Sequence, residues 1–232
     1  MSADLPPGAV PAPGPDAPPA YRTVARPAEA ELVIKRSRFI GAVWPVTTRE
    51  EAEARIAERT ALHARATHNV PAYRVGLGFL VESCSDGGEP AGTAGRPALG
   101  VLQKEDLRGV ALVVTRYFGG TLLGAAGLVR AYTDAAVAAI RAAGVVEMQL
   151  CQRLDVEVPY ALLGKVQYLL HAHAVHTGEP QYGASVVLPA WLPAGRARTV
   201  AGEVTEWTSG QARVDPGPYA YLPREPVGRA GA

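Results

Sequence analysis

The stretch Arg116-Tyr-Phe-Gly-Gly-Thr-Leu-Leu-Gly-Ala-Ala-Gly-Leu-Val-Arg130 lies between an apolar run, 110–115, and an alanine-rich segment that extends to about Ala143. The apolar run is typical of a buried strand, and the later segment predicts a helix that Gly144 ends. A strand followed by glycines and a helix start leaves backbone N–H groups free beside the positive end of a helix dipole. The stretch therefore predicts an anion-binding turn.

The glycines of this turn and the arginines near it are the candidate anion or nucleic-acid ligands. Arginine adds charge-assisted hydrogen bonds to a phosphate, and glycine allows a close approach of the backbone. The spacing matches neither a P-loop nor G-x-G-x-x-G, so the turn does not indicate ATP or NAD, and no cofactor is expected. The alternative is that the glycines serve only tight turns and close packing of the helix. The candidate ligands are Arg38, Arg116, Gly119, Gly120, Gly124, Gly127 and Arg130.

A second segment rich in glycine and proline, residues 83–97, is predicted to be a long loop. It carries Asp86 and Glu89, two carboxylates that could bind Mg²⁺, share a proton or stay solvated. Together with His63 and His68 they are the candidate acid–base residues of a hydrolase. The other functional interpretation is a protein-interaction loop, with Asp86, Glu89, Pro90 and Thr93 as the contact residues.

The spacing of histidine and cysteine residues does not indicate a metal site. Five positions separate His63 from His68, which turns their rings apart on a helix and puts them on opposite faces of a strand. The three histidines within 171–176 belong to a predicted helix end, where imidazoles interact favourably with the dipole. Cys84 could act as a nucleophile with a neighbouring histidine, but free cysteines more often serve packing. No metal is expected.

The order of predicted elements gives an α+β protein with two domains. Residues 29–145 are expected to form a mixed α/β domain, which includes a helix from the capping box at Thr48 to Leu62. Residues 148–222 follow the order β-α-β-β-α-β, that of a ferredoxin-like domain, so the boundary is placed at 144–149.

Both ends of the chain are expected to lack stable structure. Residues 1–28 contain eight prolines and few branched apolar side chains, which predicts a disordered tail. Residues 223–232 are expected to form a frayed tail. The first residues do not resemble a secretory signal, and the apolar run at 110–114 is too short to span a membrane, so a cytoplasmic location without membrane partners is expected.

The charge balance limits how this chain could bind nucleic acid. Its 232 residues include 23 Lys or Arg and 22 Asp or Glu, with a net charge of +1. Because bulk positive charge is absent, sequence-specific DNA readout is not expected, and any RNA contact must come from a local group of cations. Such an RNA-contacting face requires that the fold gather Lys35-Arg-Ser-Arg38 with Arg65, Arg74, Arg116 and Arg130.

Several motifs within about residues 30–143 resemble the IMPACT family in its bacterial, YigZ-like form. They are Lys35-Arg-Ser-Arg-Phe-Ile40, His63-Ala-Arg-Ala-Thr-His-Asn69, Ala72-Tyr-Arg74, Ser85-Asp-Gly-Gly-Glu-Pro-Ala-Gly-Thr-Ala-Gly-Arg-Pro97 and Val113-Val-Thr-Arg-Tyr-Phe-Gly-Gly-Thr-Leu-Leu-Gly-Ala-Ala-Gly-Leu-Val-Arg-Ala-Tyr132. The second half resembles the family's second domain more loosely. Gly87 and Ala91 stand where the family usually has Asp and Ser, which weakens a metal or acid–base interpretation.

This resemblance implies a first domain similar to the second domain of small-subunit ribosomal protein five. It implies a second domain similar to the last domain of elongation factor G. The implied role is a cytoplasmic, translation-linked regulatory protein whose partner is RNA, the ribosome or a protein of the translation machinery. The family implies no settled activity for bacterial members, so a binding module is favoured over an enzyme and the question of turnover stays open.

Overall fold

The computed structural model describes residues 5–224, and the chain divides into two compact units. One unit is Tyr21–Val146, and the other combines the residues up to Ala20 with those from Glu147 onward. The division at Val146 falls within the range 144–149 expected from the sequence. No helix in the described residues is long and apolar enough to cross a membrane.

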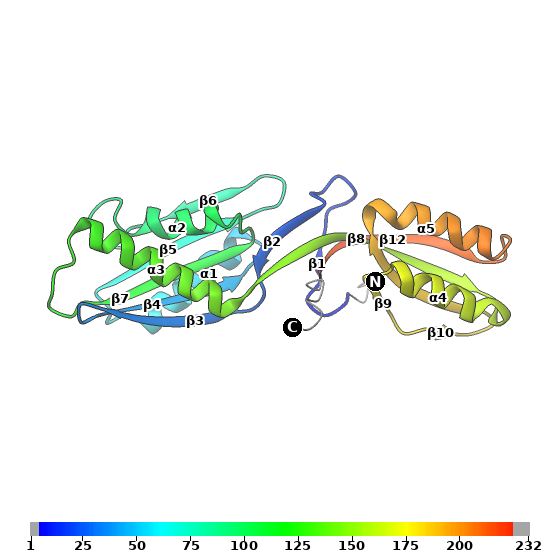
Figure 1. Cartoon of the computed structure of the whole chain (residues 1–232), viewed down its shortest axis with the longest axis horizontal. Coiled ribbons are helices and arrows are strands. Elements are labelled where there is room, and N and C mark those ends of the chain that lie inside the picture. The colour runs from blue at the N-terminus through cyan, green and yellow to red at the C-terminus, as the bar shows by residue number, and fades with distance from the viewer. Residues whose placement is uncertain (1–4, 225–232) are drawn as a thin grey trace, which may run out of the picture. The chain divides into compact units, whose positions relative to one another are not determined.

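The Tyr21–Val146 unit contains a five-stranded antiparallel sheet with the strand order β3-β4-β7-β5-β6. β7 is the apolar strand predicted from the sequence, and it lies at the centre of the sheet (Figure 1). The elements of this unit are β2 (Ala20–Val24, whose first residue belongs to the other unit), β3 (Ala28–Ile34), β4 (Ser37–Pro45), α1 (Arg49–Leu62), β5 (His68–Val75), β6 (Val81–Cys84), α2 (Gly95–Lys104), β7 (Val110–Tyr117) and α3 (Ala125–Ala143).

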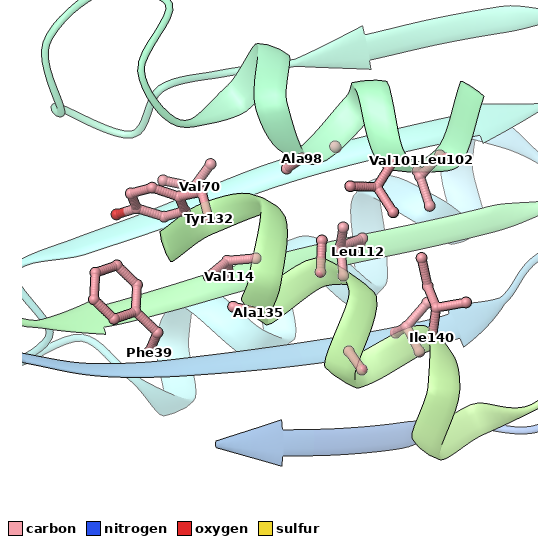
Figure 2. Packing of buried hydrophobic residues seen from close by; sticks show 14 of the residues in the cluster. Phe39, Val70, Ala98, Val101, Leu102, Leu112, Val114, Tyr132, Ala135 and Ile140 are labelled. Carbon is pink, nitrogen blue, oxygen red and sulfur yellow. The ribbon is translucent and has the colours of Figure 1, made fainter. Parts of the chain in front are cut away.

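Helices cover both faces of this sheet, which explains why every residue of β7 except its last is buried. α2 and α3 pack on one face, where Leu112 and Val114 meet Tyr132 and Ala135 (Figure 2). On the other face, Ala111 belongs to a smaller apolar cluster with Ala52 of α1. Successive side chains of a strand point to opposite faces, so a strand covered on both sides is apolar throughout.

The local signals for the helices of this unit are confirmed. The hydroxyl of Thr48 accepts a hydrogen bond from the backbone N–H of Glu51 at 3.1 Å, and α1 follows it. α3 ends at Ala143 with Gly144 as its cap, at φ +71°. α2 begins at Gly95, within the segment predicted to be a loop.

The second unit has the predicted order β-α-β-β-α-β, with the second strand split into two short pieces. Its sheet order is β1-β12-β8-β11-β10, with β9 also paired to β11. α4 and α5 cover one face. The elements are β1 (Val10–Pro11), β8 (Val145–Val158, which begins in the other unit), the 3₁₀ turn Tyr160–Leu162, α4 (Leu163–His173), β9 (His176–Thr177), β10 (Gln181–Tyr182), β11 (Val186–Pro193), α5 (Ala194–Trp207) and β12 (Arg213–Pro223).

The prediction of a disordered tail at residues 1–28 is wrong for the part that the structure describes. β1 extends the sheet by pairing with β12, and Ala9 packs on an apolar cluster that contains Cys151 and Trp191. Backbone hydrogen bonds to a sheet edge and contact with an already formed apolar surface require few branched side chains in the segment itself. The composition of the segment therefore did not reveal this order. Residues 1–4, and residues 225–232 of the predicted frayed tail, lie outside the described residues.

A close contact between β4 and α3 gives a test of this packing. A Cβ atom on Gly41 would lie 2.5 Å from the carbonyl oxygen of Ala135, whereas one on Gly100 of α2 would meet nothing within 4 Å. Gly41→Ala should lower the free energy of unfolding by about 1–3 kcal/mol through overpacking. The matched control Gly100→Ala should raise it by about 0.5–1 kcal/mol through helix propensity. Urea denaturation measures both, and equal effects would contradict the close packing of α3 on the sheet.

Candidate functional site

A pocket of about 400 Å³ lies where β7 ends and α3 begins. Strand register brings its parts together, because His68 at the start of β5 pairs with Arg116 near the end of β7. The turn between β7 and α3 and the loop between β6 and α2 provide the other walls. The lining residues are Thr67, His68, Glu89, Pro90, Arg116, Phe118, Leu122, Leu123, Gly124, Ala125 and Leu128.

A buried ion pair forms the base of this site. An Nη1–H of Arg116 donates to Oε1 of Glu89 at 2.6 Å, and the two side chains are only 6% and 3% exposed. The hydroxyl of Tyr132 donates to the same oxygen at 2.8 Å. Burial, together with the adjacent Glu89 carboxylate, raises the pKa of Tyr132 well above its usual range, so this hydroxyl keeps its proton and acts as a donor.

His68 is the second polar group of the pocket. Its Nδ1 lies 3.0 Å from the carbonyl oxygen of Gly87, and its Nε2 lies 3.7 Å from Oε1 of Glu89. Since a carbonyl oxygen only accepts, Nδ1 carries the proton and a neutral ring presents Nε2 as an acceptor. Of the four predicted acid–base residues, the structure brings His68 and Glu89 together.

The other two predicted acid–base residues have different partners. His63 does not line the pocket, and its Nδ1 forms a hydrogen bond with the hydroxyl of Tyr117 at 2.9 Å. Partial burial lowers the pKa of His63, as does the charge of Arg59. Asp86 accepts backbone hydrogen bonds from Gly92, Ala94 and Gly95, and so holds the loop against the start of α2. Both side chains therefore have clear structural roles.

The predicted protein-interaction loop, residues 83–97, is held by hydrogen bonds of its own. Besides the contacts of Asp86, the hydroxyl of Thr93 donates to the carbonyl oxygen of Pro90 at 2.7 Å. Pro90 itself is exposed and lines the pocket. Burial raises the pKa of the Cys84 thiol, and the charge of Asp86 adds to this effect, so the thiol is a poor nucleophile at neutral pH.

The predicted anion ligands do not form one set. The charge of Arg116 is paired with Glu89, and Arg38 is paired with Glu31 through two hydrogen bonds of 2.9 and 2.8 Å. The N–H of Gly119 donates to the hydroxyl of Ser37. Gly124 is the N-cap residue of α3, at φ +74°, and lines the pocket. Gly120 and Arg130 are exposed and Gly127 is partly buried, and none of these three lines the pocket.

Sequence reasoning missed Tyr132 and Phe118 as site residues. Tyr132 lies 43 positions from Glu89, and only the fold shows that its hydroxyl meets that carboxylate. The Arg116 guanidinium lies 5.4 Å from the ring centre of Phe118. The described residues contain no group of three or more His, Cys, Asp or Glu side chains that could hold a metal ion.

Comparisons with known proteins assign this chain to a family. Residues 35–140 match the Impact N-terminal domain, and residues 156–211 match a domain of unknown function, DUF1949. The IMPACT family member YvyE of Bacillus subtilis is 37% identical over 87% of this chain and 93% of its own length. The chain belongs to the IMPACT family. YigZ of Escherichia coli, another member, is 32% identical over 76% of this chain and 88% of its own.

A solved structure agrees with the fold of this IMPACT family member. The crystal structure of a hypothetical protein, 28% identical, superposes with a TM-score of 0.55 and covers 85% of this chain and 97% of that one. Every residue that lines the pocket lies within the part that matches the Impact N-terminal domain. The pocket of this chain therefore lies within its Impact N-terminal domain.

The loop contacts of Asp86 predict a pH-dependent effect on stability. Partial burial alone would raise the pKa of Asp86, but the three backbone donors and the charge of Arg96 outweigh it and hold the pKa below its usual range. A lowered pKa in the folded state adds stability above the unfolded value of about 3.9, and this stability is lost as the pH falls through the folded value. Asp86→Ala should therefore cost about 1–2 kcal/mol at pH 7 and progressively less below pH 4.

Urea unfolding at several pH values measures this difference. The exposed Asp134, which has no hydrogen-bond or ion-pair partner among residues 5–224, gives the control Asp134→Ala with little effect at any pH. A cost of Asp86→Ala that stayed constant down to pH 2 would contradict the role of the carboxylate.

The buried ion pair makes a second prediction. Glu89→Gln leaves the charge of Arg116 buried without a counter-charge, so it should lower the free energy of unfolding by about 3–5 kcal/mol. Tyr132→Phe removes one hydrogen bond to Glu89 and should cost about 1 kcal/mol. The control Glu31→Gln breaks an exposed pair with Arg38 and should leave stability near that of the wild type. Thermal unfolding ranks the three variants, and similar losses for Glu89→Gln and Glu31→Gln would refute the argument.

Proposed function

We propose that this IMPACT family member is a translation-linked protein that binds RNA. Its contacts are exposed cations at the end of the Tyr21–Val146 unit where β7 ends. The observation that carries the proposal is a group of three exposed side chains, Lys35, Arg36 and Arg65, which have no carboxylate partner among residues 5–224. Cations without a counter-charge are the side chains that an RNA phosphate neutralises.

Two contacts bring these cations to the same place. The turn that holds Lys35 and Arg36 touches the segment after β7, because a Cβ atom on Gly119 would lie 2.1 Å from the carbonyl of Arg36. The loop that holds Arg65 touches it as well, since the hydroxyl of Thr67 accepts from the backbone N–H of Phe118 at 2.9 Å. The two segments that carry these cations therefore both contact residues 118–119. Of the other predicted RNA-contacting arginines, Arg74 is buried between Glu82 and the carbonyl oxygens of Leu102 and Leu107.

The chemistry of this surface suits a single-stranded RNA. Phosphate contacts give affinity without sequence information, and an exposed aromatic ring offers a face on which a base can stack. Phe118 is 45% exposed and lies next to the segments that carry the cations. A net charge of +1 on the whole chain keeps the contact local and the affinity modest.

Family membership supports the link to translation. The family resemblance implies domains similar to parts of ribosomal protein five and elongation factor G, which are proteins that work on the ribosome. A fold-level likeness is a weaker argument than a site, so the proposal depends on the cations described above.

The test is RNA binding by a variant that lacks two of these cations. Arg36→Gly with Arg65→Ala removes two charges, and the φ of +68° at Arg36 suits glycine. Fluorescence anisotropy with a mixed-sequence 20-nucleotide RNA should show a clear loss of affinity, and the slope of log K against log salt should fall by about 1.4, at about 0.7 for each lost contact to a single strand.

The matched control is Lys104→Ala with Arg141→Ala. These two cations are also exposed and without a carboxylate partner in the described residues, but they lie at the other ends of α2 and α3. The control should bind like the wild type. Equal losses in both double variants, or wild-type binding that does not depend on salt, would refute the proposal.

A further inference from the structure

In the neutral form of His68, two hydrogen-bond acceptors face each other in the pocket. One is Nε2 of the neutral ring, because Nδ1 donates its N–H to the carbonyl oxygen of Gly87. The other is the carboxylate of Glu89, whose Oε1 lies 3.7 Å from Nε2. A ligand that supplies two N–H groups satisfies both acceptors of this form at once.

Glu89 has one oxygen left for such a ligand. Oε1 already accepts from Arg116 and Tyr132, and the side-chain hydrogen bonds of Glu89 within residues 5–224 all go to this oxygen. Glu89 cannot turn away from the pocket without breaking the buried pair with Arg116. The side chain is therefore held in position by Oε1, and Oε2 is available to bind.

Apart from Thr67 and Arg116, the rest of the pocket is apolar and suits a flat ring. Leu123 and Leu128 line it beside Leu122 and Phe118, which are 82% and 45% exposed. A pocket of about 400 Å³ is large enough for one heterocyclic base. Apolar and aromatic walls with a few convergent polar groups are the usual setting for a base that is turned out of a single strand.

We propose that this pocket binds a single nucleobase that carries an exocyclic amino group and rejects uracil. The amino group donates one N–H to Nε2 of His68 and the other to Oε2 of Glu89, and the ring packs against Phe118 and Leu122. An amino group supplies two N–H donors, and carboxylates accept from the N4 amino group of cytosine. The Watson–Crick edge of uracil has one N–H between two carbonyl oxygens, which would face the two acceptors. This inference rests on the proposed RNA binding and names the base that it selects.

The experiment compares ten-nucleotide oligo(C) and oligo(U) RNA, which have the same length and charge. Wild-type protein should bind oligo(C) about 10-fold more tightly, by fluorescence anisotropy at fixed salt. Ala125→Phe places a ring at the first residue of α3, which is exposed and lines the pocket, and should bring the ratio of the two affinities close to one. His68→Ala removes one acceptor and should lower the ratio as well.

Ala126→Phe is the matched control, because Ala126 is the next residue, is exposed and does not line the pocket. It should keep the ratio of the wild type. Binding of both oligonucleotides with equal affinity and normal salt dependence would overturn the base selection and leave the proposed function intact. A preference for oligo(C) that Ala125→Phe does not reduce would also overturn it. Failure to bind either oligonucleotide would refute the RNA-binding function itself.

Discussion

The buried ion pair between Glu89 and Arg116 connects the parts of the Tyr21–Val146 unit on which the pocket depends. Arg116 belongs to the central strand β7, and Glu89 belongs to the loop before α2. Tyr132 adds the third element, α3, through its hydrogen bond to Glu89. Taking two charges out of water costs several kcal/mol for each ion, so the pair persists only where its partners are held in place. The loop, the strand and the helix are therefore positioned together at one end of the sheet.

The surroundings of Arg116 show how this cost is reduced. Its guanidinium lies 5.4 Å from the ring centres of both Phe39 and Phe118, and Nη2 donates to the hydroxyl of Ser37 at 3.4 Å. One nitrogen, Nε, is buried without an acceptor. Aromatic faces attract a cation without competing for its counter-charge. Arg116 thus stabilises the walls of the pocket rather than offering its charge to a ligand.

The sequence predicted correctly the elements that depend on neighbouring residues. It did not predict the contacts between residues that are far apart in the chain. The capping box at Thr48 and the glycine at the end of α3 are local signals, and both elements form as expected. The pairing of Glu89 with Arg116 spans 27 positions and depends on the strand register, which no local pattern contains. Similarly, the sequence shows the three-residue spacing of Asp86 and Glu89, which suggested an acid–base role for Asp86. It does not show the three backbone N–H groups that donate to the Asp86 carboxylate.

The glycine-rich turn after β7 also has contacts between distant residues that its sequence did not predict. The sequence predicted that the arginines and the free N–H groups of this turn would bind an anion together. In the fold, the buried arginine of the turn is paired with a carboxylate, and the exposed cations of the proposed RNA contact come from other segments. Arg116 is neutralised inside, whereas Arg36 and Arg65 stay exposed and without a carboxylate partner in the described residues. Under the proposed function, a phosphate finds its counter-charge at these exposed cations, and the pocket beside them is left for an uncharged group. In a nucleotide the phosphate is charged and the base is not, so the proposed phosphate contacts and the proposed base pocket correspond to its two parts.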